Sequence, residues 1–227
     1  MEYRVEDKYI VTDAQIVCLQ SELQSYMKHD SHIEEDAYLI RSVYFDDMCD
    51  SCLCDNEIGT DEREKFRIRT YNNDKSLIQL EQKSKTRGYT SKRSERISLD
   101  DCMKYIRGEI PDMNKEDGFL KKKLYVQAST RMLSPKCIVE YERTAFVEPM
   151  GNVRITFDKN ISGTFEAETF WDEVLPGIPV LPSGQHILEV KYDEFLPDYI
   201  RKILNTGTLQ RTSYSKYYYA RVNQNIE

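Results

Sequence analysis

The segment Glu64–Tyr71, read EKFRIRTY, alternates hydrophobic and cationic residues, and this alternation constrains the fold more than any other feature of the chain. Successive side chains of a β-strand point to opposite sides, so Phe66 and Ile68 share one side while Arg67 and Arg69 share the other. Long charged side chains are seldom buried unless they are paired. Taken by itself, the segment is typical of a surface strand whose arginines are in water.

The same alternation recurs along the chain, which changes the interpretation. On one predicted strand Glu81, Lys83 and Lys85 share a side, and on another Glu189 shares a side with Lys191. We expect strands at residues 3–9, 38–45, 64–71, 76–85, 137–147, 153–158 and 187–192. Helical spacing predicts helices at residues 13–28, 99–107, 119–132, 197–204 and 212–222, and a loop with one short helix is expected at 162–183. Many strands with few helices indicate an α+β fold with an antiparallel sheet or closed barrel and helices packed outside it.

Two architectures satisfy a set of strands that each have one apolar and one cationic side. In an open sheet the charged sides face water, whereas in a closed barrel covered by helices they line the lumen. Cations about 4 Å apart repel each other by about 4 kcal/mol at an effective dielectric constant of about 20. A lumen of this kind needs an anion, and phosphate suits it because the arginine fork matches phosphate oxygens. The interspersed carboxylates Glu6 and Glu81 are either internal salt-bridge partners or ligands of a divalent metal ion that bridges phosphates.

The totals of the chain limit its class. Its 227 residues are 40% hydrophobic and 31% charged, which is typical of a globular protein, and no repeat or linker divides them. We therefore assign one domain to residues 1–227. The net charge of -7 argues against a general nucleic-acid binder. The N-terminal residues have no apolar signal segment, and no window approaches about 18 consecutive apolar residues, so we expect a cytoplasmic protein without a membrane span.

The six cysteines are expected to be reduced thiols, because the chain shows no export signal. Cys49, Cys52 and Cys54 have a spacing that can hold zinc if His29 or His32 supplies a fourth ligand. No second CxxC pair accompanies them, which favours the thiol interpretation.

Taken together, the motifs resemble the VTC polyphosphate polymerase domain of the triphosphate tunnel metalloenzyme (CYTH-like) superfamily. The resemblance covers most of the chain, and its specificity lies in the ordered set rather than in any one motif. The motifs are RVEDKYIV at 4–11, SVYFDD at 42–47, EKFRIRTY at 64–71, LEQKSK at 80–85, EYERTAF at 140–146, VRITFD at 153–158, ILEVKYD at 187–193 and SYSKYYYA at 213–220.

The resemblance implies a closed antiparallel β-barrel tunnel and a role for each matching residue. The catalytic, phosphate-binding cations that it implies are Lys8, Arg67, Arg69, Lys83, Arg143, Arg154 and Lys216. The substrate-binding residues that it implies are Tyr141 and Ser215 as hydrogen-bond donors, with Lys191 and Lys85 in the tunnel walls. Glu189 is the implied metal ligand, for Mn²⁺ or Mg²⁺.

The activity implied by the resemblance is that of a metal-dependent phosphotransferase, which transfers the γ-phosphate of ATP to a growing polyphosphate chain. The alternatives are a tripolyphosphatase or nucleoside triphosphatase, and a non-catalytic polyphosphate-binding module. The related CYTH branch begins with a Glu-x-Glu-x-Lys strand, whereas this chain has Arg4-Val5-Glu6-Asp7-Lys8. Fewer carboxylates weaken two-metal activation of water, which favours the polymerase over a hydrolase. The expected partners are ATP and polyphosphate or triphosphate; the resemblance does not imply a membrane partner, although the sequence leaves one open.

Overall fold

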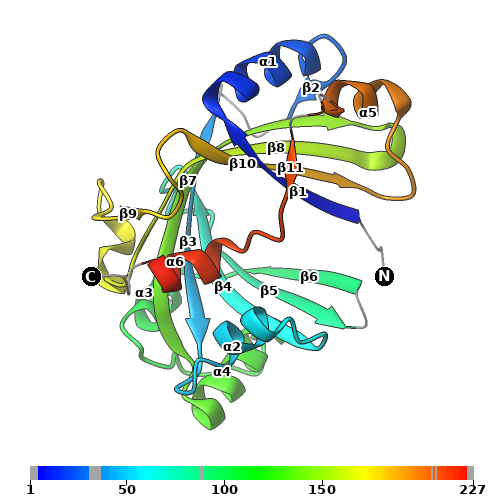
Figure 1. Ribbon diagram of the computed structural model, residues 1–227. Helices are drawn as coiled ribbons and strands as arrows, with labels where there is room; N and C mark the ends of the chain where they lie inside the picture. Colours follow the sequence, from blue (N-terminus) through cyan, green and yellow to red (C-terminus); the bar gives the residue numbers. More distant parts are fainter. Residues whose placement is uncertain (1–4, 31–36, 87–88, 206, 208, 224–227) are drawn as a thin grey trace. The chain divides into compact units, whose positions relative to one another are not determined.

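A computed structural model describes residues 5–30, 37–86, 89–205, 207 and 209–223. Within these residues the chain forms antiparallel strands and short helices (Figure 1). The strands are β1 (Val5–Thr12), β2 (Lys28–His29), β3 (Tyr38–Asp46), β4 (Arg63–Tyr71), β5 (Gln79–Thr86), β6 (Tyr89–Arg96), β7 (Ser134–Glu148), β8 (Val153–Thr164), β9 (Ile178–Pro179), β10 (Gln185–Tyr192) and β11 (Gln210–Arg211). The helices are α1 (Asp13–Leu23), α2 (Ser51–Ile58), α3 (Leu99–Ile106), α4 (Phe119–Arg131), α5 (Asp198–Leu204) and α6 (Lys216–Asn223), with 3₁₀ turns η1 (Met150–Asn152) and η2 (Ala167–Trp171).

The strands pair in the order β11-β1-β10-β8-β7-β3-β4-β5-β6, with β2 on β7 and β9 on β8. The strand pairs whose register is known are all antiparallel, as predicted. A closed barrel is not confirmed, because in the described part of the chain this order does not join its two ends. Closure would require pairing between the end strands, and β11 has only two residues while β6 is rich in lysine and arginine, as edge strands often are.

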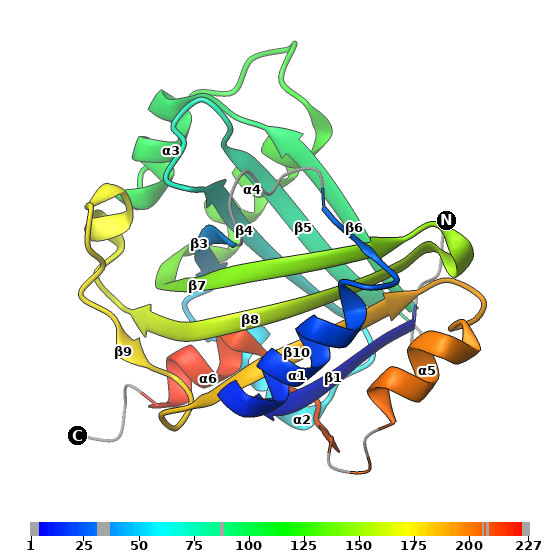
Figure 2. The same ribbon diagram turned by 90° about the horizontal axis from the view of Figure 1, so that it is seen from above.

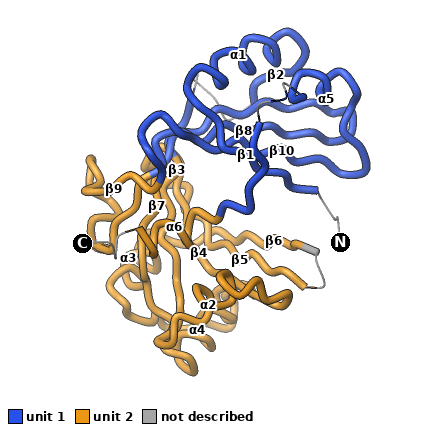
Figure 3. Tube along the Cα trace, in the orientation of Figure 1, with its two compact units in different colours: residues 1–39, 141–161, 181–214 blue, residues 40–140, 162–180, 215–227 orange. Residues whose placement is uncertain are grey.

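The chain divides into two compact units, each built from three segments (Figure 3). Unit 1 comprises Met1–Leu39, Tyr141–Ile161 and Leu181–Tyr214, and unit 2 comprises Ile40–Glu140, Ser162–Val180 and Ser215–Glu227. The assignment of a single domain stays a prediction. Each unit has a hydrophobic core of its own, and the members of each core come from that unit only.

The core of unit 1 lies between its strands and the helices α1 and α5, which lie over the same side of the strands (Figure 2). Helix α1 begins at a capping box, because the Thr12 side chain accepts from the backbone of Gln15 and the Gln15 side chain accepts from the backbone of Thr12. The helix buries Ile16, Leu19 and Leu23 at helical spacing. These side chains meet the apolar side of β8 and β10.

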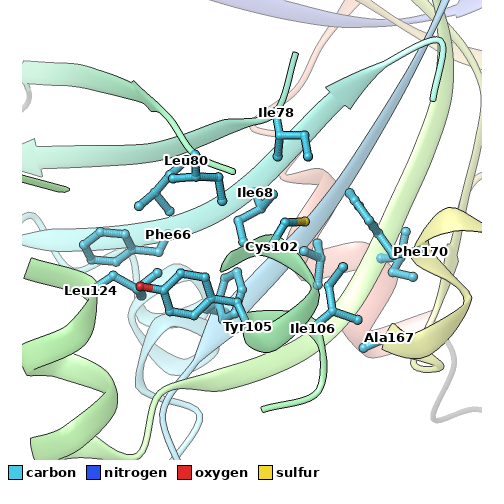
Figure 4. Close-up of a cluster of buried hydrophobic side chains, with 14 of the residues drawn as sticks. Phe66, Ile68, Ile78, Leu80, Cys102, Tyr105, Ile106, Leu124, Ala167 and Phe170 are labelled. Carbon is cyan, nitrogen blue, oxygen red and sulfur yellow. The ribbon is translucent and has the colours of Figure 1, made fainter. Parts of the chain in front are cut away.

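The core of unit 2 lies between β3–β5 and a cover made of α3, α4 and η2 (Figure 4). Phe66 and Ile68 are 2% and 0% exposed and belong to this core, so the apolar side of β4 faces the helices as its alternation predicted. Tyr105 of α3 and Leu124 of α4 pack against them. The same burial turns the arginine-bearing side of β4 away from the helices.

Where a predicted helix or strand is present in the structure, the predicted and observed bounds differ mainly at the ends of the element. The first helix ends at Leu23 rather than near residue 28, and the last helix begins at Lys216 rather than at 212. The sequence analysis missed the strand β6 and the helix α2, and also the short strands β2, β9 and β11 and the turn η1. No helix in the described ranges is both long enough and apolar enough to cross a membrane.

Candidate functional site

One side of β4, β5 and β6 in unit 2 carries a dense set of cations, which we call the cationic face. Residues opposite each other in neighbouring strands share a side, so the printed register defines this face. Its cations are Arg63, Lys65, Arg67 and Arg69 on β4, Lys83 and Lys85 on β5, and Lys92 and Arg96 on β6. Glu81 is the only carboxylate at these positions among the described residues of the three strands. A face with this balance attracts anions.

Glu81 lies at the centre of the cationic face and is 2% exposed. Its Oε2 atom accepts from Arg67 Nε at 2.7 Å and lies 2.6 Å from Arg67 Nη2, with Arg69 Nη1 at 3.7 Å. Its Oε1 atom lies 2.5 Å from Lys92 Nζ and accepts from Ser94 at 3.4 Å. Burial alone raises the pKa of Glu81, but the three cations outweigh this and hold it far below the ordinary value. These contacts match the salt-bridge alternative for Glu81.

Strand β3, which pairs with β4 along its other edge, contacts both Arg67 and Arg69. Tyr44 lies opposite Arg67 in the register, and Ser42 lies opposite Arg69. The Tyr44 hydroxyl accepts from Arg67 Nη1 at 3.0 Å, and the guanidinium lies 5.7 Å from the Tyr44 ring centre. Ser42 accepts from Arg69 Nε at 3.3 Å. Fixed orientation of the guanidinium planes is what bidentate recognition of phosphate requires.

The start of α6 brings two further predicted residues to unit 2, Ser215 and Lys216. The Ser215 hydroxyl accepts from Lys65 Nζ at 3.5 Å, and Lys216 is the first residue of α6 and is 9% exposed. Tyr217 anchors the helix, because its hydroxyl donates to the fully buried carboxylate of Asp46 at 2.6 Å. Burial and this hydrogen bond raise the pKa of Tyr217 well above its ordinary value. Asp46 also accepts from the backbone of α2 and so holds both helices.

Unit 1 carries a second group of charged residues, centred on Glu189 of β10. Glu189 is 4% exposed, and Lys8 of β1 lies opposite it in the register. Lys191 Nζ donates to Glu189 Oε2 at 3.0 Å, and Lys8 Nζ lies 3.6 Å from Oε1. Lys8 also contacts Glu6 at 3.1 Å and donates to the carbonyl oxygen of Tyr214 at 2.9 Å. Glu189, Lys8 and Lys191, which were predicted as site residues, therefore lie together with Glu6.

Arg143 of β7 joins this group through a buried ion pair. Its Nε and Nη2 atoms donate to the two carboxylate oxygens of Asp158 at 2.6 and 2.7 Å, and Nη2 lies 3.6 Å from Glu189. The guanidinium lies 5.2 Å from the ring centre of Tyr141. Burial lowers the pKa of Arg143, but Asp158 reverses the shift and the net pKa is well above the ordinary value. Arg143 therefore stays positively charged, and two nitrogen atoms of its guanidinium group are already bound to the carboxylate of Asp158.

Arg154 of β8 contacts different partners. Its Nη2 atom lies 2.6 Å from Asp30 and 3.2 Å from the Tyr38 hydroxyl, while its Nε is buried without a hydrogen-bond partner among the described residues. In the register Arg154 lies opposite Lys191. Arg4, which the comparison of motifs also used, lies outside the described residues.

Glu189 is the predicted ligand of a divalent metal ion, and this role stays a prediction. Magnesium-type ions bind through one or two carboxylates together with substrate phosphates and water. Glu189 supplies one such carboxylate, and the hydroxyl of Thr156, opposite it in the register, is buried and has no partner among the described residues. Within those residues no group of three or more His, Cys, Asp or Glu side chains is placed to hold a metal ion.

The zinc alternative for the cysteines has no support in the described ranges. Cys52 is buried and its thiol donates to the carbonyl oxygen of Glu64, while Cys49 and Cys54 are exposed. Burial raises the pKa of Cys52, which keeps it a thiol. His32 lies outside the described residues.

The structure brings the predicted site residues together in two groups. Unit 2 holds Arg67, Arg69, Lys83, Lys85, Ser215 and Lys216, and unit 1 holds Lys8, Tyr141, Arg143, Arg154, Glu189 and Lys191. The roles of these residues stay predictions. Sequence reasoning missed Lys92 and the pairing of Asp158 with Arg143. The polar run around Lys92 has no hydrophobic alternation, so the only available signal was its cationic character next to a predicted strand.

Comparison with known proteins gives a family match and structural similarities, of which two are described here. A family model described as the VTC domain matches residues 3–222. A Bacillus halodurans protein (bh2851), named as a candidate adenylate cyclase, has a TM-score of 0.57 at 14% identity, covering 100% of this chain and 98% of that one. HpAC1 from Hippeastrum, named as a candidate adenylyl cyclase with a dominant triphosphatase activity, has a TM-score of 0.55 at 12% identity, covering 98% and 96%. Identities this low show a shared fold only, and no curated protein matched.

Proposed function

The chain belongs to the VTC domain family, and on this premise we propose that it is an ATP-dependent polyphosphate polymerase. Family membership supports an activity on triphosphate or polyphosphate. The observation that carries the finer proposal is the cationic face of unit 2, where one carboxylate, Glu81, stands among the cations of three strands. A long polyanion can meet many of these cations at once, whereas a compact anion cannot. The closed tunnel, ATP as donor and a cytoplasmic location remain parts of this proposal.

The proposed reaction needs no protein nucleophile. A terminal phosphate oxygen of the growing chain attacks the γ-phosphorus of ATP in line, the bond from that phosphorus to the β–γ bridging oxygen breaks, and ADP leaves with the electron pair. Arg67 and Arg69 bind equatorial phosphate oxygens and stabilise the charge that spreads over them. Tyr44 and Ser42 keep the two guanidinium groups in orientation.

Cations of unit 1 and of α6 have the same type of role. Lys8, Lys191 and Arg143 surround Glu189, and the carboxylates of Glu6 and Asp158 offset the remaining positive charge. Lys216 and Ser215 contribute a compact charge and a hydroxyl donor. Glu189 is the residue that would hold Mn²⁺ or Mg²⁺, and such an ion would neutralise phosphate oxygens.

A triphosphatase is the second candidate function. Glu6 lies 3.1 Å from Lys8 and supplies a further carboxylate near Glu189, which is the type of group that can accept a proton from water. HpAC1, which shares the fold, is described as having a dominant triphosphatase activity. The two candidates differ in the acceptor, which is a phosphate chain in one case and water in the other.

Incubation of the purified protein with ATP and Mn²⁺ tests the proposal. Products are resolved by gel electrophoresis, and free phosphate and ADP are measured in parallel. A ladder of polyphosphate with matching ADP supports the polymerase. Free phosphate without polymer would contradict it and assign the triphosphatase. Tripolyphosphate binding without turnover would assign a binding module.

The double variant Arg67→Ala/Arg69→Ala tests the role of the cationic face. We expect it to fold and to lose tripolyphosphate binding, because the two guanidinium groups that match phosphate oxygens are gone. A matched control is Arg201→Ala/Lys202→Ala, which removes two exposed cations from α5. Equal loss of binding in both double variants would show that net charge rather than the cationic face is responsible.

A further inference from the structure

Glu81 occupies the donors that a phosphate would need. The Nε and Nη2 atoms of Arg67 both contact Oε2 of Glu81, at 2.7 and 2.6 Å, and Lys92 contacts Oε1 at 2.5 Å. Arginine presents the same edge to carboxylate and to phosphate. Donors that are engaged with an internal carboxylate are therefore not fully available to a ligand.

The carboxylate is buried, whereas part of its cationic surroundings is accessible. The Glu81 side chain is 2% exposed, those of Arg67 and Lys92 are 20% and 49% exposed, and that of Arg69 is 7% exposed. An anion arriving from solvent can thus reach Arg67 and Lys92 while Glu81 stays behind them. It must then share these cations with Glu81 or draw them away from it.

We propose that Glu81 is an internal counter-anion that competes with phosphate for Arg67, Arg69 and Lys92 and thereby sets the affinity of the cationic face for anions. This inference rests on the proposed function, since it concerns how that site chooses its ligand. Without ligand, Glu81 offsets part of the positive charge of these three cations. When an anion binds, this competition lowers the affinity for any anion that contacts only these three cations.

The consequence is selectivity for long phosphate chains. When orthophosphate binds, the cations exchange contacts to Glu81 for contacts of the same kind to phosphate. The net gain in binding free energy is therefore small. A tripolyphosphate or longer chain also reaches other cations of the face, such as Lys83 and Lys65, which lie opposite each other and one residue pair along from Glu81 on its side of the sheet. The extra contacts offset the competition for long ligands only. Glu81 is thus a specificity-determining residue rather than a catalytic one.

The variant Glu81→Gln tests this inference by calorimetric titration with tripolyphosphate and with orthophosphate. We expect tripolyphosphate to bind about tenfold more tightly than to the wild type, a change of about 1.4 kcal/mol. We expect the affinity for orthophosphate to rise by a larger factor, so that the preference for the long anion narrows. A purely structural role for Glu81 would not tighten binding.

Glu64→Gln is the matched control, because it makes the same charge change on the other side of the same sheet. Glu64 lies one residue before Lys65 and contacts Lys123 and Gln127 of α4 instead of the cationic face. We expect the affinities of Glu64→Gln for tripolyphosphate and orthophosphate to stay within about twofold of the wild type. A charge on the opposite side of the sheet acts on the anion only through screened long-range electrostatics. An equal tightening in Glu64→Gln would overturn the inference in favour of net charge.

Outcomes for the wild type separate this inference from the proposed function. Wild-type binding of tripolyphosphate that is unchanged or weakened in Glu81→Gln overturns the inference and leaves the function standing. Absence of binding in both proteins overturns both the inference and the proposed function, whereas binding in Glu81→Gln alone supports the inference.

If Glu81→Gln does not fold by itself, its circular dichroism is measured with excess tripolyphosphate. Recovery of the folded spectrum supports the counter-anion role, and failure to recover overturns it.

Discussion

Replacement of Asp158 by asparagine should destabilise the protein strongly, because it leaves a buried arginine without its counter-charge. Asp158 is 0% exposed and accepts from two nitrogen atoms of Arg143, whose side chain is 9% exposed. Asparagine has nearly the same shape as aspartate and keeps one carbonyl acceptor, so the change removes the charge with little effect on packing. The predicted loss therefore comes from electrostatics.

The magnitude follows from the burial of both partners. Breaking a buried ion pair by removing one partner costs about 3–5 kcal/mol, and the remaining carbonyl acceptor places this variant near the lower end, at about 3 kcal/mol. For a chain of this size each 1 kcal/mol lowers Tm by about 2–4 °C, so Tm should fall by about 6–12 °C. Thermal unfolding followed by circular dichroism measures this shift.

Asp198→Asn is the control for the same chemical change at the surface. Asp198 and Arg201 form an ion pair at 3.2 Å with side chains that are 83% and 62% exposed. Exposed pairs contribute about 0–1 kcal/mol, so Tm should hardly change. A fall in Tm for Asp158→Asn that is no larger than that for Asp198→Asn would refute the reasoning, because burial would then not determine the cost.

Three further predictions concern the candidate site. Glu189→Gln should reduce turnover at limiting Mn²⁺ while sparing part of the tripolyphosphate binding; equal turnover of variant and wild type across a Mn²⁺ titration would exclude Glu189 as the metal ligand. Tyr217→Phe removes the hydrogen bond to buried Asp46 and should cost about 1–3 kcal/mol in urea unfolding, with a lower kcat because α6 carries Lys216; unchanged stability would count against the anchoring role. The folded-state pKa of Glu81 is depressed below the ordinary 4.5, so its contribution to stability is present above that pH and is lost as pH falls further. Between pH 7 and pH 3 the wild type should therefore lose more stability in urea than Glu81→Gln, and parallel losses would contradict this assignment.

Local sequence patterns were sufficient to predict the elements whose signals lie within a few residues. The alternation in β4 gave its extent to within one residue and showed which side is apolar, because side-chain direction in a strand depends only on position along that strand. The start of α1 was predicted at residue 13, where the structure shows a capping box of Thr12 and Gln15, because a helix N-terminus is satisfied by side chains next to it. The end of α1 was predicted less well, since Met27 is buried beyond Leu23 and continues the apolar spacing outside the helix.

The β6 strand and the α2 helix have no signal within their own residues, and pairing or capping by residues outside each segment determines them. The β6 strand is polar throughout and adopts extended structure because its backbone pairs with β5. The α2 helix has no side-chain cap from its own N-cap residue Asp50 and instead receives hydrogen-bond acceptors from Asp46 at the end of β3. Neither interaction can be inferred from spacing within the segment itself.

The sequence by itself determined the class of the fold, the apolar and cationic sides of its strands, and the residue types that suit phosphate. Only the tertiary structure decided which carboxylate each cation meets: Glu81 for Arg67, and Asp158 for Arg143. The physical reason is that side-chain direction is a local property, whereas an ion pair depends on the register between strands. Register is a property of the folded sheet, and so the balance between cations and carboxylates is decided there.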